Sequence, residues 1–268
     1  MRLQNKVIIV TGSTTGIGKA IATRAVAEGA KVVIHGLEEA WANQVMEELG
    51  KENAVRLIAD LSEEGTPEKL VQLAVQTFGR LDAVVNNAAI VASSNVETTD
   101  KKFLQRLLDI NTIAPFLLIK TALPYLTNQR GCVLNIGSVN AYSGEPNLLA
   151  YSVSKGGLMT LTRNLGDTLH REYGVRVNQI NPGWVLTETE TERKKQHGLA
   201  EDWYKDLPTV YAPAGRILWP KEIAAAAVYW LADESGPISG QVVDLEQHPF
   251  IGRNPPKDSS TIPTHSKK

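Results

Sequence analysis

The chain has 268 residues, a formal net charge of −1 and one cysteine. This length is sufficient for a single α/β domain with a full core. The near-neutral charge argues against a nucleic-acid partner, which favours a basic surface. A single cysteine excludes a disulfide within the chain, and the apolar run around Cys132 predicts a buried, inert thiol.

The chain is predicted to be soluble and cytoplasmic, without a membrane partner. Its first residues enter a strand directly, without the basic and apolar segments of a secretory signal. A membrane span needs about eighteen consecutive apolar residues. We find no apolar run of that length; AAAAVYWLA at 224–232 is about half as long.

Short apolar runs alternate with longer helical patterns along the chain. The runs are rich in β-branched residues and lack polar alternation, which is typical of strands covered on both faces. They lie at 7–10, 31–36, 54–60, 81–88, 132–138, 175–180 and 240–245. Helices between such strands imply right-handed crossovers. We therefore expect an α/β fold, a three-layer doubly wound Rossmann sheet of about seven parallel strands, with the order reversing after the first strand.

Two segments interrupt this alternation. Residues 187–215 are polar, aromatic and weakly periodic, and a helix is expected to follow near Pro220. A long loop after a parallel strand lies at the carboxyl edge of the sheet, so this segment is predicted to be a lid or substrate loop. A surface loop without a role is the alternative. Residues 1–251 are predicted to form one domain, and the Pro-, Ser- and Lys-rich tail 252–268 is predicted to be flexible.

The first strand leads into the glycine-rich stretch TGSTTGIG, residues 11–18. Gly12 permits a tight turn, Gly16 lets the backbone approach a diphosphate, and Gly18 allows the helix to pack closely on the strand. Amide groups at the helix start favour a phosphate there. Glycines alone are a weak signal, but a cluster between a strand and a helix predicts a dinucleotide site.

Tyr151 and Lys155 lie four residues apart in AYSVSKGG, so on a helix they share one face. A free tyrosine, with a pKa of about 10, is a poor base at neutral pH, but a nearby cation favours the phenolate. Such a pair suits deprotonation of an alcohol as hydride leaves its carbon, or protonation of a carbonyl in reverse. Ser138, at a strand end, would bind the same substrate oxygen.

These motifs, with NNAA (86–89), Asn111 in DINTIAP and NPGWVLT (181–187), resemble the short-chain dehydrogenases/reductases over residues 5–245. The resemblance implies an oxidoreductase that transfers a hydride between a nicotinamide cofactor and a secondary alcohol or ketone. It implies that Tyr151 is the general acid/base, that Lys155 lowers its pKa and binds the ribose, and that Ser138 orients the substrate. Asn111 would anchor a proton-relay water. Homo-oligomers of two or four subunits are the family expectation.

The resemblance also implies the cofactor contacts. Residues 60 and 61 would flank the adenine, 87 and 88 would line a ribose, and the segment 182–187 would hold the nicotinamide amide. The expected set is Gly12, Thr14, Thr15, Gly16, Ile17, Gly18, Gly36, Leu37, Asp60, Leu61, Asn87, Ala88, Tyr151, Lys155, Pro182, Gly183, Val185 and Thr187.

The choice between NAD and NADP depends on residues after the second strand. Family members that use NAD commonly have Asp at the position of Gly36, and those that use NADP often have Arg at that of Leu37 or a basic residue at that of Thr15. None of these is present, but the carboxylates of Glu38 and Glu39 would repel a 2′-phosphate. We therefore expect NAD, with NADP as the alternative. His35 would meet a phosphate only if protonated.

A small alcohol or carbonyl compound is the expected partner. Asn140, Glu145 and Trp184 are predicted at its pocket, with Asn147 near them and His197, Trp203 and Tyr204 in the lid. Polar groups beside aromatic faces suit a sugar, a polyol or a hydroxy acid. The five histidines lack ligand spacing, so no metal site is predicted.

Two departures from the family pattern and three other functions remain to be considered. Ala89 replaces a usual glycine, which is tolerable at negative φ. The ending VVDLEQHPFIG replaces V-D-G-G and would reach a neighbouring subunit's pocket or cover its own sheet edge. The alternatives are a dinucleotide-binding sensor or scaffold, and a lyase or epimerase with a retained cofactor. SVSK (152–155) also matches the S-x-x-K of serine hydrolases, but their S-D-N and K-T-G elements are missing.

Overall fold

The computed structural model describes residues 1–249, so the tail predicted at 252–268 lies outside the described residues. The described chain contains seven strands in one parallel sheet, in the order β3-β2-β1-β4-β5-β6-β7. They are β1 (Val7–Val10), β2 (Lys31–Gly36), β3 (Ala54–Ile58), β4 (Ala83–Asn86), β5 (Cys132–Ile136), β6 (Arg176–Pro182) and β7 (Val242–Leu245). The doubly wound parallel sheet is confirmed, with its reversal after β1 and with β7 at the edge.

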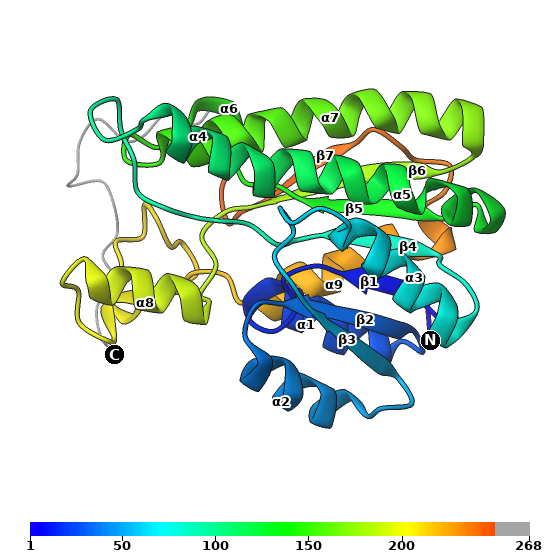
Figure 1. Ribbon diagram of the computed structural model, residues 1–268. Coiled ribbons are helices and arrows are strands. Elements are labelled where there is room, and N and C mark those ends of the chain that lie inside the picture. The colour runs from blue at the N-terminus through cyan, green and yellow to red at the C-terminus, as the bar shows by residue number, and fades with distance from the viewer. Residues whose placement is uncertain (250–268) are drawn as a thin grey trace.

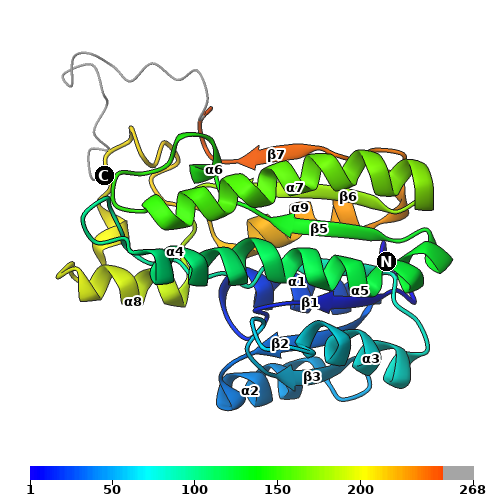
Figure 2. The ribbon, with the colours of Figure 1, turned by 45° about the horizontal axis from the view of Figure 1, so that its top comes forward.

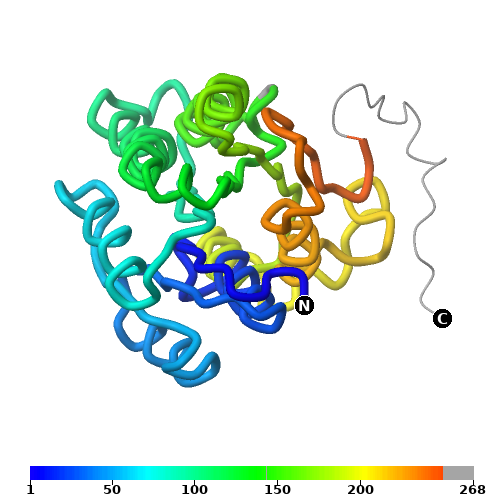
Figure 3. Tube along the Cα trace, turned by 90° about the vertical axis from the view of Figure 1, so that its right-hand side faces the viewer, coloured from blue at the N-terminus to red at the C-terminus, as the bar shows by residue number. Residues whose placement is uncertain are grey.

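Helices cover both faces of the sheet (Figure 1). One layer holds α1 (Gly16–Ala27), α2 (Glu39–Leu49) and α9 (Pro220–Leu231). The other holds α3 (Thr66–Phe78), α4 (Lys101–Leu108), α5 (Ala114–Gln129) and α7 (Leu149–Tyr173), with the π-helical turn η1 (Asp109–Ile113) between α4 and α5. Figure 3 shows α5 and α7 on one side of the strands and α1 and α9 on the other.

The core explains why the strands lack polar alternation. In β1, Ile8 and Val10 face the core shared with α1 and α9, whereas Val7 and Ile9 face the core shared with α3 and α5. All four side chains are at most 2% exposed. Both faces of each central strand are therefore apolar, which gives the continuous β-branched runs of the sequence.

One helix differs from the expectation that no segment could span a membrane. Lys101–Gln129 runs through α4, η1 and α5, and its apolar window has a mean hydropathy of 1.3, long and apolar enough to cross a bilayer by length and composition. Charged and polar residues interrupt this stretch, so a search for an unbroken apolar run does not find it. In the fold, Leu118, Ala122 and Leu126 pack into the core beside α3. The segment serves as a core helix here.

The carboxyl ends of parallel strands meet at one edge of the sheet, where open α/β folds bind ligands. Beyond this edge lie α6 (Asn140–Ser143), α8 (Glu188–Gln196) and the 3₁₀ turn η2 (Trp203–Lys205). Figure 2 shows α8 next to the strand ends, away from the N-terminus of the chain. The segment predicted as a lid, 187–215, therefore lies where ligands bind in this class of fold.

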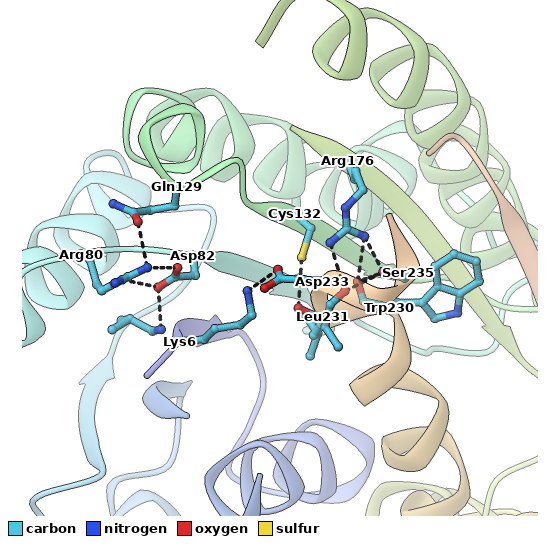
Figure 4. Close-up of polar contacts among 12 residues, drawn as sticks. Lys6, Arg80, Asp82, Gln129, Cys132, Arg176, Trp230, Leu231, Asp233 and Ser235 are labelled. Atoms are coloured by element: carbon cyan, nitrogen blue, oxygen red, sulfur yellow. Dashed lines mark hydrogen bonds and ion pairs between the residues drawn. The ribbon is translucent and has the colours of Figure 1, made fainter. Parts of the chain in front are cut away.

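Polar contacts hold the opposite end of the sheet together (Figure 4). The Asp82 carboxylate, 3% exposed, accepts hydrogen bonds from both Nε (2.8 Å) and Nη2 (2.6 Å) of Arg80. Nearby, Arg176 donates to the Ser235 hydroxyl at 2.6 Å, and η3 (Asp233–Ser235) caps α9. Cys132 is 3% exposed and burial raises the pKa of its thiol, which fits the predicted inert role.

Candidate active site

The turn after β1 has room only for glycine at two positions. Gly12 has a φ of +60°, and a Cβ there would lie 2.8 Å from the Ala88 Cα. A Cβ on Gly18 would lie 2.2 Å from the Gly12 carbonyl oxygen. Side chains at these positions would push the turn away from the loop after β4 and from the start of α1. The sequence therefore fixes the close packing that brings backbone amides to the pocket.

Three side chains brace this turn. The Thr11 hydroxyl accepts hydrogen bonds from the backbone amides of Asn87 (3.0 Å) and Ala88 (3.1 Å). The Asn87 side-chain amide donates to the carbonyls of Thr11 and Gly12, both at 2.9 Å. His35, 2% exposed, accepts from the Gly12 amide at 3.3 Å through Nδ1. The loop after β4 and the end of β2 thus hold the turn from two sides.

His35 is unsuited to meeting a phosphate. Its Nε2 bonds the Ala59 carbonyl at 2.9 Å, so both ring nitrogens have partners. Desolvation by burial lowers the pKa of His35 to about 4, and the ring is therefore neutral at pH 7. The imidazole acts as a structural link between β2, the glycine turn and the end of β3.

The main pocket has a volume of about 800 Å³ and opens at the carboxyl ends of the strands. At its glycine-rich end, the Gly16 amide at the start of α1 donates to the Glu188 carboxylate at 3.0 Å. A carboxylate oxygen there stands where a phosphate oxygen would bind, so the helix start accepts an anion. The residues present therefore fit a dinucleotide: glycines where backbone approach is needed, an anion-binding amide, and a pocket of ligand size.

Tyr151, Ser138 and Lys155 converge on this pocket. Tyr151 lies in the first turn of α7, is 8% exposed, and shares a hydrogen bond between its hydroxyl and that of Ser138. Lys155, one turn later, is 2% exposed and donates to the Ile136 carbonyl at 2.7 Å. Its ammonium nitrogen lies 5.8 Å from the centre of the Tyr151 ring. The segment just after β5 and the first two turns of α7 thus bring three polar side chains to one pocket.

Burial drives both titratable groups toward their neutral forms. Desolvation raises the pKa of Tyr151 to about 12, although the Ser138 hydrogen bond opposes this. Desolvation also lowers the pKa of Lys155 to about 7. The sequence-level expectation was a lowered tyrosine pKa. The cost of burying the phenolate outweighs the stabilisation that the Ser138 hydroxyl gives it.

Asn111 lies behind α7, outside the pocket lining described for residues 1–249. It sits in η1 and is fully buried, and its side chain bonds both the amide (2.8 Å) and the carbonyl (3.0 Å) of Ile90. It also donates to the Ser154 hydroxyl at 2.9 Å. Asn111 therefore joins the loop after β4 to α7, directly beneath the Tyr151 turn, where Ser154 donates to the Tyr151 carbonyl at 2.7 Å.

Most of the predicted cofactor residues line the pocket. They are Gly12, Thr15, Gly16, Ile17, Asn87, Ala88, Tyr151, Lys155, Pro182, Gly183, Val185 and Thr187. Six others lie outside the lining as described: Thr14, Gly18, Gly36, Leu37, Asp60 and Leu61. Leu37 is 63% exposed, whereas Leu61 is part of the core. The Asp60 carboxylate is paired with Arg106 at 2.5 Å, and its pKa is lowered to about 2 by hydrogen bonds from Arg106 and Ser62 that outweigh desolvation.

The predicted substrate residues Asn140, Glu145 and Trp184 also line the pocket. Trp203 stacks on Trp184 with ring centres 5.1 Å apart, and Tyr204 packs edge-on against Trp203. Asn147 and His197 line a separate small cavity instead. Ser152, the serine of the S-x-x-K match, is not activated by Lys155. Its buried hydroxyl lacks a hydrogen-bond partner in the described chain, and Lys155 donates to the Ile136 carbonyl instead.

The sequence did not single out the charged wall that α8 provides. Glu190 accepts hydrogen bonds from the Trp184 indole at 2.9 Å and from Arg193 Nε and Nη2, both at 2.9 Å. Lys194 lies 4.9 Å from the centre of the Trp184 ring. Glu190, Arg193 and Lys194 all line the pocket. Alternating charges in a short helix are typical of a solvated surface, so only the helix's place at the sheet edge reveals this wall.

The chain's unusual ending turns back onto its own pocket. The Glu246 carboxylate accepts from the Trp184 amide at 2.8 Å, and Gln247 donates to the Arg216 carbonyl at 2.6 Å. Glu246 and His248 are both in the pocket lining. Residues 246–248 join the segment after β6 to the end of the lid, whereas the extension from residue 250 on lies outside the described residues. Ala89 adopts a negative φ, as its fit requires.

Comparisons with known proteins agree with this geometry. A family model described as enoyl-(acyl carrier protein) reductase matches residues 12–246. The chain is 34% identical to L-fucose dehydrogenase of Rattus norvegicus over 97% of this chain and 95% of the relative. It is 33% identical to NADP-dependent (R)-specific alcohol dehydrogenase of Lentilactobacillus kefiri, over 87% and 92%.

A solved structure gives the same result. That of 3-ketoacyl-(acyl-carrier-protein) reductase from Brucella melitensis, complexed with NADH, superposes with a TM-score of 0.81 at 29% identity, covering 91% of this chain and 98% of the other. The fold, the glycine turn and the relatives together give one conclusion: this chain belongs to the short-chain dehydrogenase/reductase family and is an NAD(P)-dependent oxidoreductase.

Proposed function

We propose that the protein interconverts a secondary alcohol and a ketone, with Tyr151 as general acid/base. The observation that carries this proposal is the convergence of buried Tyr151, Ser138 and Lys155 on the pocket that also receives the glycine turn. The cofactor, when bound, supplies or accepts the hydride and in its oxidised form adds positive charge to the pocket. The chain's own residues then handle the proton and the substrate oxygen.

The protonation states favour a definite division of roles. With a pKa of about 12, the Tyr151 hydroxyl is protonated at neutral pH and is ready to donate to a carbonyl oxygen. The Ser138 hydroxyl, which shares a hydrogen bond with it, would hold that oxygen in line. In the direction of alcohol oxidation, protonated Lys155 would favour the phenolate. Lys155 would also bind the ribose, and Asn111, beneath the Tyr151 turn, would support a proton relay.

We propose NAD as the preferred cofactor, with NADP as the alternative. Arg56, on the neighbouring strand β3 opposite Ile34, is engaged with Glu39 at 3.2 Å, which leaves it little positive charge to offer a 2′-phosphate. The buried His35 is neutral at pH 7. Calorimetric titration with each dinucleotide tests this, and tighter binding of NADP than of NAD would contradict it.

A sugar, polyol or hydroxy acid is the proposed substrate class. The Trp184 ring offers an apolar face, while Asn140, Glu145 and the α8 side chains offer hydrogen-bonding groups in the same pocket. This combination suits a ligand with several hydroxyl groups better than an acyl chain. Similarity to L-fucose dehydrogenase supports the same class.

The test is a panel of aldoses, polyols, hydroxy acids and apolar alcohols, followed by the absorbance of reduced cofactor. We expect turnover on hydroxylated substrates. Turnover confined to apolar alcohols would reject the substrate class but keep the reaction. A failure of every alcohol and ketone to change the absorbance would reject the reaction itself.

We also propose a cytoplasmic homo-oligomer of two or four subunits. Helices α5 and α7 present large apolar side chains to solvent, with Phe116 and Leu117 each 40% exposed and Val153 49% exposed. Large apolar side chains exposed on two helices favour association, and a second copy of the same chain would cover them.

A further inference from the structure

Glu188 holds the backbone amide that a cofactor diphosphate is expected to use. The Gly16 amide donates to Glu188 Oε2 at 3.0 Å. A Cβ built on Gly16 would lie 3.3 Å from the Thr187 methyl carbon, so the start of α8 is in contact with the glycine turn. The carboxylate is therefore positioned in the anion site by close packing of two segments far apart in the sequence.

Two helix N-termini meet at this point. Helix α1 begins at Gly16, and α8 begins at Glu188 with Thr187 as its N-cap. Within the described chain, the first turn of α1 has no acidic residue of its own. Each helix start carries partial positive charge, so Glu188 neutralises both. A diphosphate would do the same with more charge, but two anions cannot share one amide without strong repulsion.

Helix α8 is held in a way that lets it withdraw. All of its residues are exposed or half-buried, so its displacement would expose little apolar surface. Its attachments are polar: Glu190 to the Trp184 indole at 2.9 Å, and His197 to Ser93 at 3.5 Å. Breaking such contacts at a wet pocket costs far less than opening a packed core.

We propose that Glu188 is an internal competitor of the cofactor diphosphate, and that cofactor binding requires α8 to leave the glycine turn. This inference rests on the proposed dinucleotide cofactor. Because α8 also carries Glu190 and Arg193 of the substrate pocket, its displacement links the substrate wall to the occupancy of the cofactor site. The observed affinity for the cofactor is then the affinity of molecules whose α8 has left the glycine turn, multiplied by the fraction of such molecules.

Calorimetric titration with NAD, NADP and ADP-ribose tests this in the wild-type protein, Glu188→Ala and Glu188→Gln. Glu192→Gln is the matched control, because Glu192 is exposed on the same helix and, within residues 1–249, its carboxylate accepts a hydrogen bond from Gln196 alone, at 3.3 Å. Circular dichroism verifies folding of each variant. We expect Glu188→Ala to bind ADP-ribose and the preferred dinucleotide about tenfold more tightly, and Glu188→Gln to change in the same direction. Glu192→Gln should match the wild type.

Hydrogen exchange provides a second readout without turnover. Saturating ADP-ribose should increase amide exchange in α8 of the wild-type protein, and in Glu188→Ala the exchange should already be high. Equal or weaker binding by Glu188→Ala, with wild-type binding intact, would overturn the competition alone. A wild-type protein that binds none of the three nucleotides would overturn the proposed function, and the competition with it.

Discussion

Lys155 lies one helical turn from Tyr151, with its ammonium nitrogen 5.8 Å from the ring centre and hydrogen-bonded to the Ile136 carbonyl. Burial raises the pKa of Tyr151 to about 12 and lowers that of Lys155 to about 7. Both groups therefore favour their neutral forms before a ligand arrives. In the proposed function, the pair would transfer a proton only when new charge enters the pocket, which would link acid/base chemistry to cofactor binding.

Replacement of Lys155 by methionine should separate activity from stability. The variant removes the cation proposed to favour the phenolate, so kcat should fall by about 10²- to 10⁴-fold. Its Tm should change little, because methionine removes the cost of burying the amine but leaves the Ile136 carbonyl without its 2.7 Å hydrogen bond. Steady-state kinetics and a thermal melt measure both, with the exposed Lys51→Met as control. A kcat close to that of the wild type would contradict the role of Lys155.

His35 should make the free energy of unfolding depend on pH. Its folded pKa of about 4 lies below the ordinary value of 6.5, so the unfolded state binds more protons between these two values. The free energy of unfolding therefore rises with pH across this window. The neutral His35 contributes roughly 3 kcal/mol of stability above the unfolded pKa, and this contribution is lost as the pH falls toward the folded pKa. Urea denaturation at several pH values should give a flatter profile for His35→Asn. Identical profiles would contradict the buried, neutral imidazole.

Asp82 should contribute to stability and not to catalysis. Its carboxylate accepts from the Val7 amide at 2.9 Å and from two nitrogens of Arg80, at the end of the sheet opposite the pocket. Asp82→Ala should lower the free energy of unfolding by about 2 kcal/mol, because it leaves the buried Val7 amide without an acceptor, whereas Arg80 remains partly solvated. Asp233→Ala is the control, since that carboxylate is 86% exposed and its pair with Lys6 should contribute under about 1 kcal/mol. Equal losses in urea denaturation would refute the distinction.

The apolar surface of α5 and α7 should be an interface between copies of the chain. A carboxylate at Phe116, which is 40% exposed, would be buried unpaired in such an interface. Phe116→Glu should therefore shift the mass measured by light scattering toward the monomer, whereas Lys51→Glu, at an exposed position after α2 on the other side of the sheet, should have less effect. A wild-type protein that is monomeric at all concentrations would disprove the interface.

The sequence was sufficient to predict the sheet, because burial on both faces leaves a clear pattern, and to bring Ser138, Tyr151 and Lys155 to one pocket. The β1 run is apolar at every position, and residues just past strand ends, such as Ser138, are forced to the carboxyl edge. The position of Tyr151 and Lys155 on one face of α7 follows from their spacing of four residues. These placements depend on local spacing or on the parallel topology, so they can be predicted from the sequence alone.

Other features depend on tertiary placement. Arg193 belongs to a helix whose charges alone suggest solvent, and it reaches the pocket only because the chain after β6 turns across the strand ends. Asn111 lies in the π-helical turn η1 and accepts from the Ile90 amide, and spacing rules for an α-helix describe neither feature. Burial raises the pKa of Tyr151, and the depth of burial is a tertiary property that the spacing of Tyr151 and Lys155 does not give.

The most direct test of the account is the Tyr151→Phe variant, measured for turnover and for cofactor affinity on the same preparation. Removal of one hydroxyl should lower kcat by about 10³-fold or more, while the calorimetric Kd for the cofactor changes by less than about twofold. Turnover within about tenfold of the wild-type rate, with cofactor binding intact, would mean that another group carries the proton.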